Sequence, residues 1–291
     1  MAVREVKFSR TGRPTLEGAG EHLSRAFGNG DEQEFDPFLM LDDFRNDDPE
    51  MYQRGFPWHP HRGIETITYV IEGEVDHGDS LGNEGTIGVG DVQWMTAGSG
   101  IIHQEMPRGD RRGRMGGFQL WLNLPAASKM TEPRYQGVKA AQIPMVEQDG
   151  AWVRVIAGTV GGVTGPVADV FADPEYLDVM LRPGAVWEHP TPAGHTVFAY
   201  VYQGDARFAG EEQPAAAVRG RVVLFGDGDS VKVAAGDGGA GLLLASGRPL
   251  HEPIAWRGPI VMNTLEELDV AWLELQAGTF VKHGKPPARG A

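Results

Sequence analysis

Residues 55–73 read GFPWHPHRGIETITYVIEG and combine a strand signal with a closely spaced pair of histidines. The run ETITYVIEG at residues 65–73 is rich in Ile, Thr, Val and Tyr and ends at Gly73, which is typical of a β-strand that ends in a turn. His59 and His61 precede this run and are two residues apart. Side chains at that spacing on a strand point to the same face, so we expect the two imidazoles to converge.

The rest of the chain repeats this pattern of short strand-like runs separated by turn-forming residues. The 291 residues include 41 glycines and 20 prolines, and glycine at about 14% is roughly twice its average share. Further runs are TIGVGDVQWMTAG at residues 86–98 and FQLWLNL at residues 118–124. Many short strands joined by tight turns are typical of sandwiches and barrels, so we predict an all-β protein.

One helix is predicted near the end of the chain. Thr264 and Glu267 have the spacing of a capping box, and Gly278 is a typical stop signal. The apolar stripe that should pack on the β body consists of Leu265, Leu268, Trp272 and Leu275.

The length suggests about two domains, and a proline-rich and lysine-containing segment at 125–144 is expected to link them. The halves resemble degenerate copies: YVIEG ends at Gly73 and YVYQG ends at Gly204. A second similarity relates the GVGD sequence at 88–91 to FGD at 225–227. Counting from these glycines places Pro190, Pro192 and Gly239 where the first half has His59, His61 and His103. The second half is therefore expected to lack a site of this kind.

Composition excludes several classes of function. The chain has 26 Lys and Arg against 40 Asp and Glu, a net charge of −14, which opposes direct binding to nucleic acid and to anionic membranes. There is no cysteine, so disulfides, thiol catalysis and thiolate metal sites are excluded. No stretch approaches the roughly 20 apolar residues of a membrane span, and no signal peptide is evident. We expect a cytoplasmic protein.

A second pair of potential ligands follows the first. His103 and Glu105 are again two residues apart, so on a strand they share a face. Together with His59 and His61 they supply three nitrogens and one oxygen, which suits a divalent ion of Fe, Mn, Co, Ni or Cu, and a tetrahedral Zn site is a further alternative. Four protein ligands on an octahedral ion leave about two positions for substrate or O2. Glu65 also has the parity of an inward-facing ligand.

Other polar residues have simpler interpretations. The remaining histidines are expected to be surface or hydrogen-bonded core residues: His22, His77, His189, His195, His251 and His283. The cluster Arg108, Arg111, Arg112 and Arg114 is either a solvated loop or a guide for an anionic ligand.

These motifs resemble a known family. The spacing from Gly55 through His59, His61 and Glu65 to Gly73 resembles the first cupin motif. The stretch from Gly90 to His103 resembles the second motif, except that the glycine-rich segment before the histidine is longer. More specifically, the chain is similar to the pirin family in FLMLDDF (38–44), HPHRGIETITY (59–69), GDVQWMTAGSGIIHQEMP (90–107), FQLWLNLP (118–125) and GPIVMNT (258–264). Pirins are two-domain cupins with one metal in the N-terminal barrel.

The resemblance implies a fold and a ligand set. It implies two cupin barrels of the double-stranded β-helix (jelly-roll) type, here a metal-binding domain at 1–135 and a degenerate cupin domain with the terminal helix at 136–291. In pirins the carboxylate ligand lies two residues after the second-motif histidine. By that match the ligands are His59, His61, His103 and Glu105. Glu65 is then a hydrogen-bond acceptor around the ligands, with direct metal contact as the alternative.

The resemblance also implies an activity, because several pirins resemble quercetin 2,3-dioxygenase. A flavonol would bind the ion through its 3-hydroxyl oxygen, O2 would open the central ring with release of carbon monoxide, and Glu105 would act as both ligand and general base. The expected cofactor is one divalent ion per chain, iron(II) first and Mn, Co, Ni, Cu or Zn as alternatives.

A second hypothesis is regulatory, because some pirins resemble redox-responsive partners of transcription factors or metabolic enzymes. In that case a protein partner would bind a surface that depends on the oxidation state of the metal, and the Arg108 to Arg114 cluster would be the first surface to test. A structural metal site in a binding cupin is the third interpretation. A monomer is the expected oligomeric state, because two packed barrels shield most sheet edges.

Overall fold

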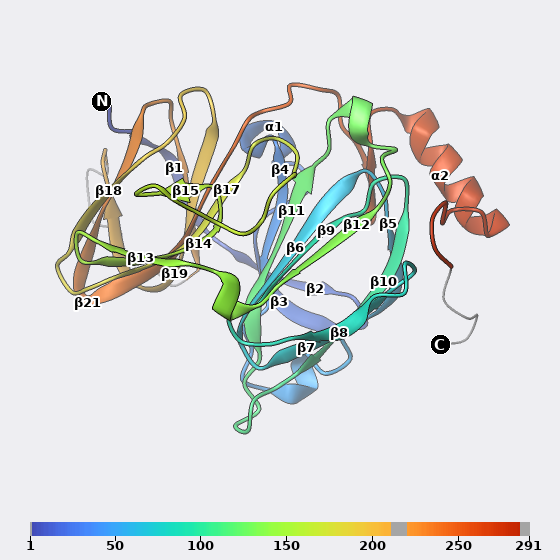
Figure 1. Ribbon diagram of the computed structural model, residues 1–291, viewed down its shortest axis with the longest axis horizontal. Coiled ribbons are helices and arrows are strands. Elements are labelled where there is room, and N and C mark those ends of the chain that lie inside the picture. Colours follow the sequence, from blue (N-terminus) through green and yellow to red (C-terminus); the bar gives the residue numbers. More distant parts are fainter. Residues whose placement is uncertain (1, 211–219, 286–291) are drawn as a thin grey trace. The chain divides into compact units, whose positions relative to one another are not determined.

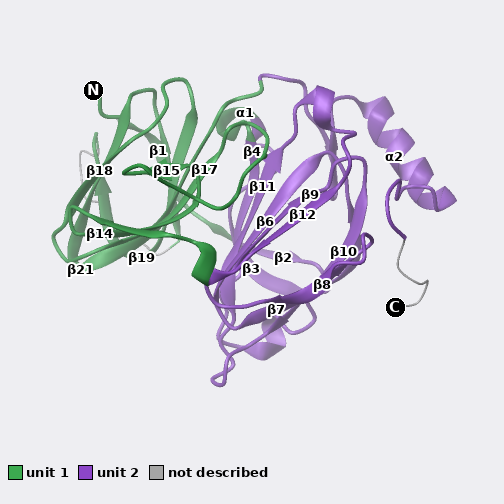
Figure 2. Cartoon of the chain, viewed as in Figure 1, with its two compact units in different colours: residues 1–13, 33–37, 141–250 green, residues 14–32, 38–140, 251–291 purple. Residues whose placement is uncertain are grey.

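The computed structural model describes residues 2–210 and 220–285, and the chain divides into two compact units (Figures 1 and 2). The unit formed by residues 14–32, 38–140 and 251–291 is called the first barrel. The unit formed by residues 1–13, 33–37 and 141–250 is called the second barrel. Strands dominate both units, which confirms the all-β prediction.

The first barrel contains a seven-stranded and a four-stranded sheet. The larger sheet has the order β12 (Arg134–Val138), β9 (Val92–Thr96), β6 (Ile64–Glu72), β11 (Gly116–Asn123), β4 (Phe38–Asp43), β3 (Glu21–Phe27) and β2 (Arg13–Glu17). The smaller sheet has the order β5 (Phe56–His61), β10 (Ile101–Arg108), β7 (Glu74–Asp79) and β8 (Glu84–Ile87). The neighbouring strands from β12 to β3 in the larger sheet are antiparallel, as are all neighbours in the smaller sheet.

The second barrel is built mainly from one sheet with two long strands. Its order is β1 (Val6–Thr11), β20 (Arg221–Phe225), β19 (Thr196–Phe208), β21 (Ser230–Gly247), β17 (Glu175–Leu181), β14 (Ala151–Ala157) and β13 (Met145–Gln148), and β18 (Val186–Pro190) pairs with β21. A small hairpin joins β15 (Thr159–Val160) to β16 (Val163–Thr164). Its interior is apolar and includes Val153, Leu177, Trp187, Val233 and Leu244.

The remaining elements are short, apart from one helix. They are the helix α1 (Glu32–Phe35), the 3-10 turns η1 (Pro49–Met51), η2 (Ala126–Ser128) and η3 (Ala140–Gln142), and the hairpin of β22 (Ala255–Arg257) and β23 (Ile260–Met262). The terminal helix α2 (Leu265–Ala277) begins with the predicted capping box of Thr264 and Glu267 and ends at Gly278, whose φ is 72°. Leu265 is exposed, contrary to expectation, and Leu268 and Ala271 are the buried residues.

The units differ from the contiguous halves 1–135 and 136–291. The helix α2 packs with β22 and β23 on the first barrel, because Leu268 and Ala271 share an apolar cluster with Ile260 and Ile102. The N-terminal strand β1 instead pairs with β20 of the second barrel. Each barrel therefore recruits a terminal segment from the opposite end of the chain, which a linear division of the sequence does not predict.

The repeat is confirmed, but its register differs from the prediction. Gly90 donates its backbone N–H to Val70 O at 2.7 Å, and Gly220 donates to Val201 O at 2.8 Å. Both glycines have positive φ and lie one or two residues before a strand that pairs with the Tyr-Val strand. The counterpart of Gly90 is therefore Gly220 and not Gly226, because Gly226 follows β20 instead of preceding it.

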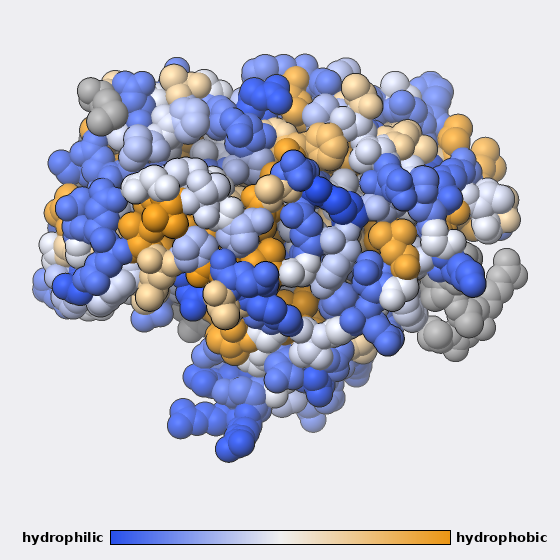
Figure 3. All heavy atoms as spheres, viewed as in Figure 1, coloured by the Kyte–Doolittle hydropathy of each residue, from blue (hydrophilic) through white to orange (hydrophobic). Residues whose placement is uncertain are grey.

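The surface agrees with the composition. On the face seen in Figure 3, hydrophilic residues dominate and apolar residues form small separate patches. Neither helix in residues 2–210 and 220–285 combines the length and the apolar character that a membrane crossing requires.

Candidate metal centre

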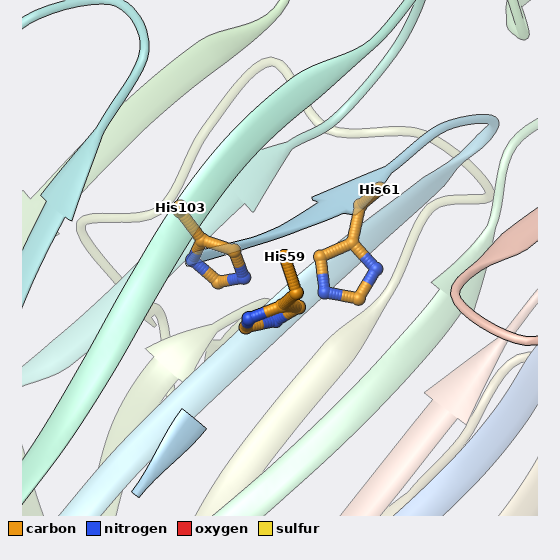
Figure 4. Close-up of side chains that lie close together, drawn as sticks. All are labelled: His59, His61 and His103. Carbon is orange, nitrogen blue, oxygen red and sulfur yellow. The ribbon is translucent and has the colours of Figure 1, made fainter. Parts of the chain in front are cut away.

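Three histidines converge inside the first barrel. His59 and His61 lie on β5 and His103 on the neighbouring strand β10, where His103 is directly opposite His59. Their ring centroids are 4.4 to 5.0 Å apart, and their candidate ligand atoms all lie within 4.8 Å of one another (Figure 4). The strand alternation predicted from the sequence has therefore brought three imidazoles to one point.

Backbone carbonyls select which nitrogen of His59 and His61 faces a ligand. Nδ1 of His59 donates to Pro57 O at 2.8 Å, and Nδ1 of His61 donates to Pro259 O at 3.1 Å. Because a carbonyl oxygen only accepts, each Nδ1 carries hydrogen and each Nε2 keeps its lone pair. This arrangement is the usual one for histidines that bind a metal through Nε2.

The surroundings of His103 indicate whether a metal ion fits between the three histidines. It is 1% exposed, and neither of its ring nitrogens forms a hydrogen bond within the described part of the chain. A buried polar atom without a partner is costly, and a metal ion would satisfy one of these nitrogens. Burial also lowers the pKa of His59, His61 and His103, which keeps the rings neutral as ligands must be. The three histidines are thus suited to bind a metal ion.

Glu105 is next to this group but outside it. It is buried on β10, on the same strand face as His103, and its Oε1 accepts a hydrogen bond from Thr68 Oγ1 at 2.6 Å. Burial raises the pKa of Glu105 to about 7, against the opposing effect of the Thr68 hydrogen bond. The group whose ligand atoms lie within 4.8 Å of one another contains only the histidines, so the role of Glu105 as a ligand stays a prediction.

Glu65 does not face the histidines. On β6 it is three residues from Thr68, which bonds to Glu105, and strand alternation puts residues an odd number apart on opposite faces. Its Oε1 accepts a hydrogen bond from Thr96 Oγ1 at 2.7 Å on that other face. The expectation that Glu65 faces inward was wrong, because a turn at Gly63, with φ of 78°, interrupts the strand between His61 and Ile64.

His59 and His61 open onto a cavity of about 570 Å³ in the first barrel. His59, His61 and Glu105 are in its wall, with polar neighbours Thr68, Gln119, Asp42, Arg25 and Glu21. Its apolar wall is formed by Leu23, Met40, Phe44, Phe56, Val75, Trp121 and Trp256. Trp121 contacts His61 edge-on at 5.0 Å and packs at 5.8 Å against Trp256. Broad aromatic surfaces therefore lie directly beside the histidines.

Comparison with known proteins identifies the family. The family model described as Pirin matches residues 20–122, and the model described as the Pirin C-terminal cupin domain matches residues 176–281. A pirin-like protein of Caulobacter vibrioides is 47% identical over 96% of this chain and 100% of its own length. Human pirin is 39% identical over 94% of this chain and 92% of its own. The chain belongs to the pirin family.

A solved structure supports the same fold for this pirin. The crystal structure titled quercetin 2,3-dioxygenase from Acinetobacter baumannii has a TM-score of 0.86 and 33% identity, and it covers 96% of this chain and 99% of its own. With the family match, this likeness confirms two cupin barrels.

The second barrel of this pirin retains one histidine of the constellation. His61 is opposite Ile101 in the β5 and β10 pairing, and His189 is opposite Val231 in the equivalent β18 and β21 pairing. The same register places Trp187, Val233 and Ala235 where the first barrel has His59, His103 and Glu105. Pro190, Pro192 and Gly239 are thus not the counterparts, but the predicted degeneracy is real. His189 bonds to Glu175 at 2.9 Å and stacks on Trp187.

The other predicted residues lie away from the three histidines. None of the remaining six histidines joins the group, and His77 bonds to the Tyr135 hydroxyl at 2.7 Å. Arg108 pairs with Glu74 and Asp76, and Arg114 pairs with Glu72 and Asp110. Arg108, Arg111, Arg112 and Arg114 are not among the residues that line the cavity. The structure therefore favours the solvated-loop interpretation of this cluster.

Several cavity residues were missed by sequence reasoning. Thr68 and Gln119 have the parity of inward-facing strand residues, which is a signal that was present but common to many positions. Trp256 on β22 and Pro259 in the turn between β22 and β23 lie at this site although they are far along the chain, and no local pattern indicates this.

Proposed function

We propose that this pirin is a metal-dependent dioxygenase that cleaves a flavonol such as quercetin with O2. The observation that carries the proposal is the cavity of about 570 Å³ whose wall contains His59 and His61 together with Trp121 and Trp256. Such a site suits a planar aromatic substrate placed beside a metal ion. The related structure titled quercetin 2,3-dioxygenase supports the same reaction.

His59, His61 and His103 would hold the ion, with Glu105 as the fourth ligand. Three nitrogens and one oxygen suit iron(II), which we propose as the native metal ahead of Mn, Co, Ni, Cu and Zn. The ion would lower the pKa of the flavonol hydroxyl and supply the site at which substrate and O2 meet.

The protein's own groups would orient the substrate and take its proton. Trp121 and Trp256 present apolar faces to the flavonol rings and exclude water from one side. The carboxylate of Glu105 is buried in the same cavity and has its pKa raised to about 7 by burial. This carboxylate would accept the 3-hydroxyl proton and later return it to the ring-opened product.

The test is aerobic loss of the flavonol absorption band with simultaneous detection of carbon monoxide. Protein loaded separately with Fe(II), Mn, Co, Ni, Cu or Zn would be compared with the His103→Ala variant. Metal-dependent turnover that His103→Ala abolishes is the expected result. No turnover with any metal, despite stoichiometric binding, would overturn the proposal and favour a regulatory role.

A second variant tests the base. Glu105→Gln keeps the shape of the side chain but accepts no proton, so we expect turnover to fall by about 100-fold or more. Full flavonol turnover by a metal-loaded Glu105→Gln protein would remove the base assignment.

A further inference from the structure

Three polar side chains form a hydrogen-bonded chain that ends at Glu105. Thr68 Oγ1 on β6 lies 2.6 Å from Glu105 Oε1 and 2.8 Å from Gln119 Oε1 on the adjacent strand β11. Gln119 is directly opposite Thr68 in the sheet, so the two side chains share the inner face. All three line the cavity next to His59 and His61.

The number of available hydrogen atoms limits how Thr68, Glu105 and Gln119 can be hydrogen-bonded to one another. The Thr68 hydroxyl has one hydrogen but lies within hydrogen-bond distance of two oxygen atoms. A second hydrogen must come from one end, either from a protonated Glu105 or from the Gln119 amide turned so that its NH2 faces Thr68. In both cases the Thr68 oxygen is bonded on both sides, and the carboxyl group is tied to the rigid sheet.

Thr68 is also the sole hydrogen-bonding partner of the Glu105 carboxylate among residues 2–210 and 220–285. Oε1 is therefore occupied, while Oε2 accepts no hydrogen bond from those residues. Thr68 is 2% exposed and Glu105 is 7% exposed, so water gives the carboxylate little alternative support. The rotation of this carboxylate depends on one hydroxyl group.

We propose that Thr68, anchored by Gln119, is a positioning residue that holds Glu105 by Oε1 and leaves Oε2 as the oxygen for a metal ion on His59, His61 and His103. The inference rests on the proposed function only in that Glu105 is taken as a ligand. It does not depend on which substrate the metal centre acts on. Removal of a hydrogen-bond partner of a metal ligand typically weakens metal affinity 10- to 100-fold.

The chain offers a matched control. Thr66 lies on the same strand and the same face, two residues earlier, and it is also 2% exposed. It is opposite Trp121 and forms no hydrogen bond to Glu105. Thr66→Val and Thr68→Val make the same chemical change in the same sheet, so a general effect of valine on packing would affect both variants alike.

The experiment measures Co(II) affinity and the visible absorption of Co(II)-loaded protein, which reports coordination geometry. Thr68→Val is expected to weaken Co(II) binding about tenfold or more and to change the spectrum. The Co(II) affinity of Thr66→Val should stay within about twofold of that of the parent protein. Thr68→Ser, which keeps the hydroxyl, should restore both readouts. In a Glu105→Gln background, Thr68→Val should have no further effect.

Two outcomes overturn the inference. The first is a Thr68→Val protein with the affinity and spectrum of Thr66→Val. The second is a Thr68→Val effect that persists in full when Glu105 is already Gln, because the hydroxyl would then act through another group. If Thr68→Val does not fold, Gln119→Leu provides the same test, because it removes the anchor while Thr68 stays, and an unchanged spectrum would overturn the inference.

These readouts separate this inference from the proposed function. Flavonol turnover is not among them, so a protein without dioxygenase activity still tests the role of Thr68. A Glu105→Gln variant with unchanged Co(II) affinity and spectrum would show that Glu105 is not a ligand, and the inference would fail even if flavonol were cleaved.

Discussion

His61 donates a hydrogen bond from Nδ1 to the carbonyl oxygen of Pro259, at 3.1 Å, across 198 residues of sequence. The hairpin of β22 and β23 thereby sets the tautomer of a candidate metal ligand. Lys129 reinforces this link, because its buried Nζ donates to Gly63 O, Asn123 Oδ1 and Val261 O at 2.7 to 2.9 Å. The C-terminal segment thus helps to build the candidate metal centre.

Gly63→Ala is expected to weaken this link. A Cβ on Gly63 would lie 2.0 Å from Val261 O, and the backbone there has φ of 78°, which disfavours other residues. We expect a loss of more than about 2 kcal/mol in the free energy of unfolding, together with weaker metal binding because the hairpin must move. Denaturant unfolding and metal titration measure the two effects.

Gly82→Ala is the matched control. Gly82 also has positive φ, of 91°, but a Cβ there meets nothing within 4 Å. Gly82→Ala should lose only about 1 kcal/mol in the free energy of unfolding, from the unfavourable backbone conformation alone. Its metal binding should be normal. Equal losses in the two variants would show that contact with the hairpin does not matter.

Metal should bind in a ratio of one ion per chain. The first barrel brings three histidines together, whereas Trp187, Val233 and Ala235 fill the equivalent positions of the second. His103→Ala is expected to weaken binding by at least about 100-fold, and His189→Ala to leave it unchanged. Elemental analysis after dialysis measures both. Two ions per chain, or loss of metal from His189→Ala, would contradict the assignment.

Trp256→Ala is expected to impair flavonol binding without loss of metal. Trp256 lines the cavity and packs on Trp121, and Trp121 is the ring that contacts His61. Loss of an aromatic contact should raise KM about tenfold, since such contacts contribute about 1 kcal/mol beyond the area they bury. Trp256→Phe should recover most of this loss. Steady-state kinetics at fixed metal content are the measurement, and an unchanged KM for Trp256→Ala would place the substrate elsewhere.

The stability of the metal-free protein should depend on pH through Glu21. This cavity residue is 2% exposed and accepts a hydrogen bond from Gly55 N at 2.6 Å, and burial raises its pKa from 4.5 to about 7. Between these values the folded state binds more protons than the unfolded state. The free energy of unfolding should therefore fall as pH rises from 4.5 to 7, by at most about 3 kcal/mol from this group.

Glu21→Gln isolates this contribution, because the amide keeps an oxygen for Gly55 but does not titrate. Denaturant unfolding of both proteins across this pH range should show the parent protein losing stability relative to the variant. Parallel curves would mean that Glu21 titrates as an ordinary exposed carboxyl group.

Much of the centre was determined by local sequence. The positions of His59 and His61 on one face, and of His103 and Glu105 on another strand, follow from the two-residue period of a strand. The capping box of Thr264 and Glu267 and the stop at Gly278 are also local, since they involve hydrogen bonds within one turn of helix. These features did not depend on which strands pair.

Tertiary structure decided the rest, because strand pairing and chain reversal are not local. The turn at Gly63 reversed the face of Glu65, and the pairing of β18 with β21 showed that Trp187, Val233 and Ala235 replace the candidate ligands of the first barrel. The packing of α2 and the β22 and β23 hairpin on the first barrel brought Pro259 to His61. The sequence by itself determined which side chains can bind a metal, and the tertiary structure determined which groups hold those side chains in place.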